Sequence, residues 1–249
     1  MSRIVLTAAS RIGCVRSNNE DMVLAFDKLF RSDAYKTELM TENTDRFIVA
    51  IADGMGGHNA GEVASEEVLS NLKFFINDLP HGLTPGEMNE MMAEWIDSIN
   101  KRVNSHGLMD PSKLEMGTTL VGVLYFCGHY YWMNCGDSRL YRLRDGQLIQ
   151  LTTDHSLIKK DGTQRHSNVI TNCIGAGIQN SYIDFYEFTN DVLPGDAYLL
   201  CSDGLNDMIT DTEIEELMVA NKSANQLCEA AIEAGGFDNV STCVFHIDK

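Results

Sequence analysis

The order of its apolar segments constrains the fold of this chain more than any other feature of the sequence. Short segments typical of β-strands come first, followed by two segments with helical spacing, a long β-rich stretch, two more helical segments and a last strand-like segment. A regular alternation of strand and helix, which would predict a parallel sheet, does not occur. We therefore expect an α+β fold in which antiparallel sheets carry paired helices on their outer faces.

The predicted strands are short and apolar. The stretch from 118 to 152 is rich in β-forming residues, and Asp145-Gly146 within it is a strong hairpin signal. Residues 27–46 are largely polar, and we expect them to form either an ordered excursion or a mobile loop. The other predicted strands cover residues 4–9, 22–26, 47–52, 182–189, 196–201 and 240–247.

Four helices are predicted from apolar spacing and from capping residues. The first carries Val68, Leu72 and Ile76 on one face and ends before Pro80. The second begins at residues 84–87, TPGE, a capping box with proline at the first helical position. The last two helices are expected at residues 210–220 and 223–234.

Size and charge limit the class of protein. The chain has 249 residues and is expected to form a single domain, residues 1–249. Its net charge of −17 argues against nucleic acid or an anionic membrane as a partner, because both require a basic face. An acidic protein that handles an anionic substrate needs a local source of positive charge, and a bound divalent cation is the obvious one.

Cysteine usage and hydropathy indicate the compartment. The seven cysteines include no C-x-x-C pair and lie mostly in apolar stretches, as is typical of reduced thiols in the cytosol. The first residues lack the layout of a signal peptide, and no apolar run approaches the ~18 residues of a membrane span. We expect a soluble, cytoplasmic protein with no membrane span.

Two acidic residues stand where apolar strands end. Asp53 follows FIVAIA and Asp203 follows AYLLCS, and each is followed by glycine. An ionised carboxylate at the mouth of a buried strand is costly unless something compensates it. For each position alone, a turn or a helix N-cap explains the residue equally well, whereas Asp145 and Asp161 have the charged surroundings of ordinary turns.

The glycines after Asp53 could belong to a phosphate-binding loop or to a metal site. The segment GMGGHNAG matches neither common phosphate-binding loop, and an acid in front of it would repel an anion. A metal ion resolves this conflict, with Asp53 and the Gly54 carbonyl as ligands and with the absent side chains leaving room for solvent and substrate. Oxygen ligands of this kind suit Mg²⁺ or Mn²⁺ better than zinc.

Three further acidic positions lie beside turn residues and next to apolar segments. They are Glu20-Asp21, Asp137 and Asp238. Each is unremarkable by itself, because Asp and Asn favour turns. Together they supply enough carboxylates for a two-metal cluster, although their spacing alone does not show that they converge.

Seven short motifs, taken in order, resemble the metal-dependent serine/threonine protein phosphatases of the PPM or type 2C family, especially the small bacterial type. The resemblance extends over nearly the whole chain, and its specificity comes from the order of the motifs. They are GCVRSNNED at 13–21, DGMGGHNAGE at 53–62, GTT at 117–119, NCGDSR at 134–139, LTTDHS at 151–156, SDGL at 202–205 and DNVS at 238–241.

The resemblance implies a four-layer α-β-β-α sandwich, two antiparallel sheets flanked by helix pairs, with two Mn²⁺ or Mg²⁺ ions at one end. By position, Asp53 resembles the ligand shared by both ions, and Asp203 and Asp238 resemble ligands of the first. Glu20 and the Gly54 carbonyl resemble ligands of the second. The implied activity is hydrolysis of phosphoserine and phosphothreonine in proteins by a metal-bridging hydroxide, which requires no protein nucleophile.

The resemblance also implies residues that bind the phosphate, hold a water and form a third metal site. Arg16 resembles the residue that binds the phosphate, and Asp21 an acceptor that holds metal-bound water. Asp137, with Asp203 and Asp207, resembles a weaker third-metal site. The proton donor to the leaving oxygen is open between His58 and a metal-bound water, since the position after Asp53-Gly54 is occupied by Met55 rather than histidine.

Several motif residues are expected to support the site rather than to react. Hydroxyl groups beside strands more often satisfy backbone groups than perform chemistry, so we interpret Thr118, Thr119 and Ser138 in this way, together with Arg139. One departure from the family pattern is a short flap, residues 157–168, which leaves substrate specificity open. Arg165 and His166 within it are interpreted as loop charges, with phosphopeptide contact as the alternative.

The expected partner is a phosphorylated protein, a Ser/Thr kinase or one of its targets in bacterial signalling, and the chain is expected to be a monomer. A rival hypothesis is a phosphatase-like binding module with weak or no turnover. The intact set of acids argues against it, because such acids are costly to hold together without metal. A hydrolase of small phosphoesters is a third alternative.

Overall fold

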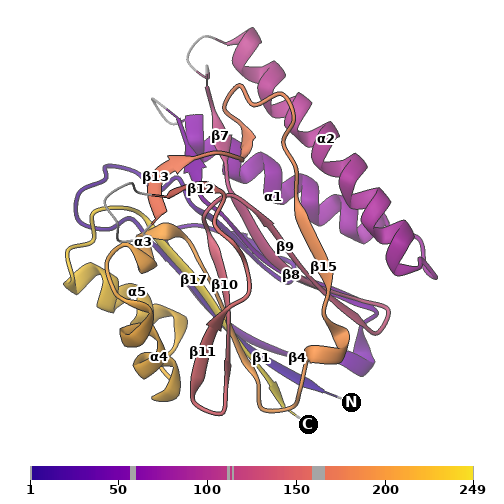
Figure 1. Ribbon diagram of the computed structural model, residues 1–249, viewed down its shortest axis with the longest axis vertical. Coiled ribbons are helices and arrows are strands. Elements are labelled where there is room, and N and C mark those ends of the chain that lie inside the picture. The colour runs from indigo at the N-terminus through magenta and orange to yellow at the C-terminus, as the bar shows by residue number, and fades with distance from the viewer. Residues whose placement is uncertain (1, 57–59, 111–112, 114, 159–165, 249) are drawn as a thin grey trace.

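The computed structural model describes residues 2–56, 60–110, 113, 115–158 and 166–248. Two six-stranded sheets pack face to face, and helices cover the outer face of each (Figure 1). Every described strand pairing is antiparallel. The predicted four-layer α-β-β-α sandwich is therefore confirmed.

The first sheet contains both ends of the described chain. Its strands are, in spatial order, β11 (Gln147–Gln150), β10 (Arg139–Arg144), β16 (Ala197–Cys201), β17 (Val240–Asp248), β1 (Arg3–Arg11) and β4 (Ala34–Met40). The second sheet is built in the order β15 (Asp184–Glu187), β9 (His129–Cys135), β8 (Leu120–Phe126), β5 (Arg46–Ala52), β2 (Met22–Ala25) and β3 (Lys28–Phe30).

Two small sheets complete the β-structure. One joins β14 (Ile174–Gly175), β7 (Gly117–Thr118) and β6 (Gly54–Met55). The other is formed by β12 (Ser156–Ile158) and β13 (His166–Ile170), the two ends of the predicted short flap. The middle of that flap, including Arg165, lies outside the described residues.

Helices α1 (Ala60–Asp78) and α2 (Pro85–Met109) cover the second sheet, while α3 (Asp203–Asn206), α4 (Asp211–Val219) and α5 (Ala224–Glu233) cover the first. The capping box predicted at Thr84 and Glu87 is present. Equivalent boxes begin α4 and α5, which satisfies backbone donors at the start of each helix. No helix in the described part of the chain is long and apolar enough to cross a membrane.

Strand β5 explains the apolar run FIVAIA. Phe47, Val49 and Ile51 pack between the two sheets, whereas Ile48 and Ala50 face α1 and α2. Because both faces of the strand are covered, both sets of alternate side chains must be apolar. The run ends at the edge of the sandwich, where Asp53 follows.

The polar stretch 27–46 is ordered, which decides between the two alternatives given for it. It contains β3, β4 and the 3₁₀ turn Thr41–Asn43, and β4 pairs with β1. Tyr35 and Leu39 pack against the inner core while Lys36 and Glu38 are exposed. This is the period-2 pattern of an edge strand with one solvated face, so the sequence does carry a strand signal that the polar composition obscures.

Candidate metal centre

Five aspartates from distant parts of the sequence meet at one end of the sandwich, and we call them the aspartate cluster. Asp21 precedes β2 and Asp53 follows β5 in one sheet, whereas Asp203 follows β16 and Asp238 precedes β17 in the other. Asp137 lies between β9 and β10. The other four all raise the pKa of Asp53 by electrostatic repulsion, in addition to its burial. The convergence that spacing alone could not show is thus present.

Four carboxylates of the aspartate cluster have pKa values raised above the ordinary range: Asp21, Asp53, Asp137 and Asp203. Burial, the largest cause, raises the pKa of Asp21 and of Asp137 to about 6. Burial together with repulsion from Asp137 and Asp207 raises the pKa of Asp203 to about 8. The pKa of Asp53 is raised well above its ordinary value. Without a cation, these groups cannot all be ionised at neutral pH.

Three buried oxygen atoms of this cluster have no hydrogen-bond donor among the residues that the structure describes: Oδ1 of Asp21, Oδ1 of Asp137 and Oδ1 of Asp203. Buried polar atoms are normally satisfied, so three unsatisfied acceptors close together need an explanation. Hard oxygen donors gathered in this way fit a divalent cation such as Mg²⁺ or Mn²⁺. The residues present therefore fit the metal centre that the motifs imply.

The backbone of Asp53 is fixed by the GTT motif. The Asp53 amide donates to Thr119 Oγ1 at 3.1 Å, and the Asp53 carbonyl accepts from Thr118 Oγ1 at 2.8 Å and from the Thr119 amide at 2.9 Å. Thr119 Oγ1 also lies 2.7 Å from Ser138 Oγ. These hydroxyl groups satisfy backbone groups and one another, in agreement with the supporting role expected for them.

The glycine after Asp53 is required by backbone packing. A Cβ atom on Gly54 would lie 2.2 Å from the Gly61 carbonyl oxygen and 2.6 Å from the Glu20 carbonyl oxygen. The start of α1, the residue after Asp53 and the loop before β2 therefore touch through their main chains. The expectation that the absent side chain of Gly54 leaves room for solvent and substrate is wrong at this position, because other backbone atoms fill the space.

Glu20 is positioned by Asn239, an asparagine to which the sequence analysis assigned no role. Asn239 Oδ1 accepts from the Glu20 amide at 2.8 Å, and Asn239 Nδ2 donates to the carbonyls of Ile12 and Asn18, both at 2.9 Å. Asn239 thereby joins the loop that carries Glu20 to the start of β17. Burial raises the pKa of Glu20. The sequence could have indicated this role, because Asn239 belongs to the DNVS motif at 238–241.

Arg16 lies at the rim of the aspartate cluster. Its Nη2 atom is 2.6 Å from Asp238 Oδ2, and this hydrogen bond raises the pKa of the guanidinium. About half of the Arg16 side chain, 51%, is exposed to solvent. Asp207 is exposed at the end of α3 and adds negative charge near Asp137 and Asp203. His58 lies outside the described residues.

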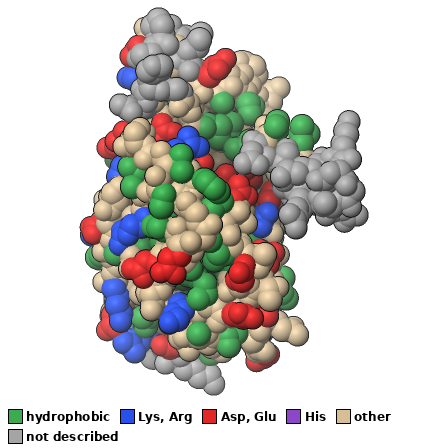
Figure 2. Space-filling view, turned by 90° about the vertical axis from the view of Figure 1, so that its left-hand side faces the viewer, with side chains coloured by type: hydrophobic (Ala, Val, Ile, Leu, Met, Phe, Trp, Pro, Cys, Tyr) green, Lys and Arg blue, Asp and Glu red, His purple; other side chains and the backbone are tan. Residues whose placement is uncertain are grey.

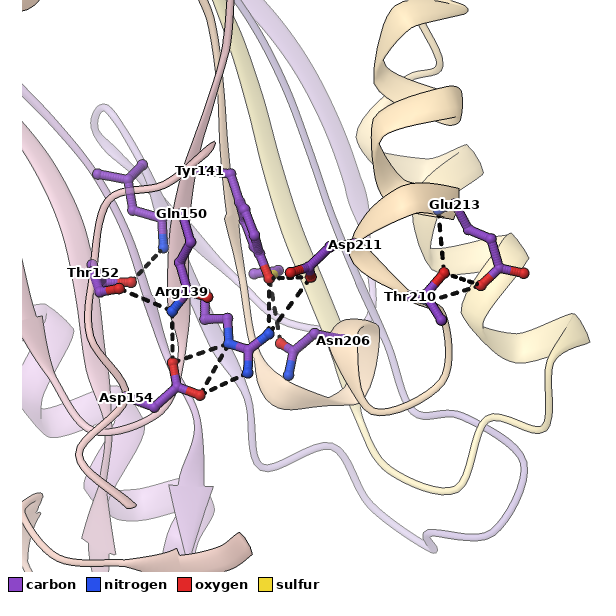
Figure 3. Close-up of polar contacts among 11 residues, drawn as sticks. Arg139, Tyr141, Gln150, Thr152, Asp154, Asn206, Thr210, Asp211 and Glu213 are labelled. Atoms are coloured by element: carbon purple, nitrogen blue, oxygen red, sulfur yellow. Dashed lines mark hydrogen bonds and ion pairs between the residues drawn. The ribbon is translucent and has the colours of Figure 1, made fainter. Parts of the chain in front are cut away.

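Arg139, two residues after Asp137, joins the segment before β12 to the first sheet and to the start of α4 (Figure 3). Its Nε and Nη2 atoms donate to both oxygens of Asp154, with the shortest contact at 2.7 Å, and Nη1 donates to Tyr141 Oη. Tyr141 Oη in turn donates to Asp211 at the start of α4. The paired hydrogen bonds hold the segment before β12 against β10, which agrees with a supporting role.

His155 fixes the loop before Asp137 and is a second residue that the sequence analysis did not identify. The Gly136 amide at 3.2 Å and Asn172 Nδ2 at 2.9 Å both donate to His155 Nδ1. Nε2 therefore carries the proton and donates to Asp184 Oδ2 at 3.0 Å. The signal was the LTTDHS motif, in which His155 precedes the flap.

The sequence and the structure both match known proteins. A family model described as protein phosphatase 2C matches residues 26–233. The chain is 34% identical to the serine/threonine protein phosphatase PstP of Mycobacterium tuberculosis over 98% of its own length. It spans about half of that relative, 46%. It is 32% identical to the serine/threonine phosphatase stp of Listeria monocytogenes, over 83% of this chain and 87% of that relative.

The fold is also that of a solved phosphatase. The catalytic domain of PstP in complex with two manganese ions superposes with a TM-score of 0.76 at 32% identity, and the alignment covers 100% of both chains. The family match extends over most of the sequence and includes five of the seven motifs, while those at 13–21 and 238–241 lie just outside it. This chain belongs to the protein phosphatase 2C family.

Proposed function

We propose that the chain hydrolyses phosphoserine and phosphothreonine in proteins with the help of bound divalent cations. The observation that carries the proposal is the aspartate cluster with its three donor-free oxygens, bordered by Arg16. The relatives from Mycobacterium and Listeria, which are named as serine/threonine phosphatases, support it. We also propose that residues 1–249 form one phosphatase domain, which the same relatives support.

Two cations would be held at the cluster. Asp53 would be shared between them, Asp203 and Asp238 would hold one, and Glu20 with the Gly54 carbonyl would hold the other. When bound, the cations would lower the pKa of a water and neutralise charge on the phosphoryl group. Mn²⁺ is favoured by the manganese complex of PstP, and Mg²⁺ suits the same oxygen ligands. Asp137, with Asp203 and Asp207, is proposed as a third, weaker site.

The residues of the chain would orient the substrate and its water. Arg16, half exposed, can turn its guanidinium from Asp238 to phosphate oxygens and there balance the charge that grows in the transition state. Asp21 is fully buried, and its Oδ2 atom accepts from Ser202 at 2.8 Å, which leaves Oδ1 free to hold a water. His58 would donate the proton to the leaving oxygen, with a metal-bound water as the alternative donor.

The proposed substrates are phosphorylated proteins, and the reaction would oppose a bacterial Ser/Thr kinase. We also propose a cytoplasmic monomer. On the face shown in Figure 2, acidic side chains are dispersed among basic ones, and the net charge of −17 argues against a nucleic-acid partner.

The test is phosphate release from a phosphothreonine peptide with Mn²⁺, with excess EDTA, and by the Asp203→Asn variant with Mn²⁺. We expect turnover with Mn²⁺ that EDTA abolishes. We expect Asp203→Asn to lower this turnover more than about 100-fold, because removing a metal ligand should cost at least as much as removing a group that only hydrogen-bonds to a ligand. Asp97→Asn, an exposed carboxylate on α2, is the matched control and should keep full activity.

Two results would contradict the proposal. Phosphopeptide binding without turnover, in folded protein with Mn²⁺, would favour the binding module. A higher kcat/KM for small phosphoesters than for phosphopeptides would favour a metabolic hydrolase instead.

A further inference from the structure

A second group of potential metal ligands lies at the opposite end of the sandwich. Asp45 precedes β5, His81 follows α1, and Cys127 lies in the turn between β8 and β9. Their ligand atoms all lie within 4.8 Å of one another. His81 Nδ1 is 3.1 Å from Asp45 Oδ2 and 3.9 Å from Cys127 Sγ. We call this group the distal cluster.

The distal cluster is separate from the aspartate cluster. Asp45 and Asp53 flank the seven residues of β5 at opposite ends. At the rise of an extended strand this places them roughly 25 Å apart. The two groups share no residue, and all three members of the distal cluster are exposed.

Hydrogen bonds to the main chain hold together the segments that carry the three residues. The Cys127 amide donates to the Asp45 carbonyl at 2.6 Å. Arg46 Nη1 donates to the carbonyls of Ile76 and Leu79, both at 2.9 Å, so the end of α1 that leads to His81 is joined to the start of β5. The three ligands therefore lie in connecting segments that hydrogen bonds join to one another.

Arg46 also acts on the carboxylate itself. Its Nη2 atom lies 2.9 Å from Asp45 Oδ2, and its hydrogen bonds lower the pKa of Asp45, which keeps the carboxylate ionised. Ligating carboxylates are commonly held by such an outer partner. The positive charge of Arg46 also opposes a second cation, which predicts weaker binding than at a site of three free ligands.

Turn chemistry does not explain the cysteine. Cys127 and Gly128 have φ values of 49° and 93°, so both central residues of the hairpin turn are left-handed. Such turns favour Asn, Asp or Gly at the first position, whereas a cysteine there is unusual. Its thiol lies beside an imidazole and a carboxylate at the surface, where a packing role is excluded by exposure.

We propose that the distal cluster binds Zn²⁺ through Asp45 Oδ2, His81 Nδ1 and Cys127 Sγ, with water in the fourth position. Zinc accepts sulfur, nitrogen and oxygen ligands, and its tetrahedral geometry places ligand atoms about 3.3–3.6 Å apart. His81 Nδ1 already lies 3.1 Å from Asp45 Oδ2 and 3.9 Å from Cys127 Sγ, and the Asp45 and Cys127 ligand atoms, within 4.8 Å of each other, would move closer on binding. The thiol loses its proton on binding. Thiolate and imidazole ligands make this site unsuited to Mg²⁺, in contrast to the all-oxygen aspartate cluster.

The test is a titration of the untagged, full-length protein with Co²⁺, a spectroscopic substitute for zinc, in the presence of excess Mn²⁺. Only a cysteine ligand gives sulfur-to-cobalt charge-transfer absorption, and the five aspartates of the other cluster offer no thiol. We expect this absorption in the wild type and in Cys14→Ser, the matched control at the other exposed cysteine. We expect its complete loss in Cys127→Ser and at least about tenfold weaker binding in His81→Asn.

Competition identifies the preferred ion, because Zn²⁺ should displace Co²⁺ and remove the absorption. Absence of the absorption in the wild type would overturn the proposal. So would its persistence in Cys127→Ser, or binding in His81→Asn that is unchanged from the wild type. Since all three side chains are exposed, none of these substitutions is expected to prevent folding.

Discussion

Four aspartates of the aspartate cluster, Asp21, Asp53, Asp137 and Asp203, favour metal binding at the expense of the stability of the metal-free fold. A buried carboxylate disfavours its own ionisation, and its neighbours disfavour it further. Asp203 illustrates this, since burial and the charges of Asp137 and Asp207 raise its pKa to about 8. The residues that would hold the cations thus destabilise the metal-free protein at neutral and higher pH.

The first prediction concerns the stability of the metal-free protein. The folded pKa of Asp203, about 8, lies above its ordinary value of 3.8, so its stabilising contribution is complete below pH ~4 and is lost as pH rises toward 8. In EDTA, Asp203→Asn should therefore melt at a higher temperature than the wild type at pH 8, with a smaller difference at pH 5. Thermal melts at both pH values check this; a variant less stable than the wild type at pH 8 would contradict it.

The second prediction concerns Asn239, which is only 4% exposed. Asn239→Ala leaves the Glu20 amide and two carbonyls without their partner, which should cost about 1–3 kcal/mol of stability. We expect Mn²⁺ affinity to fall about 10–100-fold because Glu20 loses its position. Calorimetric titration with Mn²⁺ and urea unfolding measure the two effects. Asn89→Ala, on the exposed face of α2, is the control, and an equal effect there would refute the assignment.

Among the helices and strands, close contacts between main chains decide where the ligands lie. Gly54, the first residue of β6, lies against the start of α1 and the loop before β2. Only a residue without a side chain permits this approach. The edge strand β4 differs, because its position depends on a local pattern. Buried and exposed side chains alternate along it, although its polar composition makes this alternation hard to recognise in the sequence.

The third prediction compares two glycines. Gly54→Ala would force a Cβ to within 2.2 Å of the Gly61 carbonyl oxygen, and we expect a loss of about 1–3 kcal/mol with reduced phosphatase activity. At Gly86, in the first turn of α2, an added Cβ would lie 4.0 Å from Thr84 Oγ1, an ordinary van der Waals distance. Gly86→Ala should be neutral or stabilising by up to about 1 kcal/mol. Urea unfolding of both variants distinguishes them, and equal losses would show that close packing is not the cause.

In the molecule as a whole, the aspartate cluster joins the two sheets. Asp21 and Asp53 belong to one sheet, and Asp203 and Asp238 to the other. A cation bound by both sets would connect the two layers of the sandwich. Metal binding should therefore stabilise the entire fold rather than one loop.

The fourth prediction is that this stabilisation depends on pH. Mn²⁺ must displace protons from the buried carboxyl groups. The pKa is raised to about 6 for Asp21 and Asp137 and to about 8 for Asp203, so these groups hold protons at low pH. The increase in Tm on adding Mn²⁺ should thus be larger at pH 8 than at pH 5.5. Scanning calorimetry with Mn²⁺ and with EDTA measures it, and an increase independent of pH would show that the buried carboxylates are not the ligands.

The fold class, the pairs of helices with their capping boxes, and the candidate acids could all be predicted from the amino-acid sequence. This was possible because periodicity, capping and strand-end acids are local signals within short segments. Burial on both faces of β5 likewise follows from six consecutive apolar residues, Phe47 to Ala52.

Three-dimensional packing was needed to learn which acids meet, why Gly54 must be glycine, and how Asn239 and His155 hold the loops of the site. It also revealed the distal cluster, whose members Asp45, His81 and Cys127 are 36 and 46 residues apart in sequence. Each of these features depends on contacts between segments that are distant along the chain. Register and sheet packing set such contacts, and no local pattern encodes them.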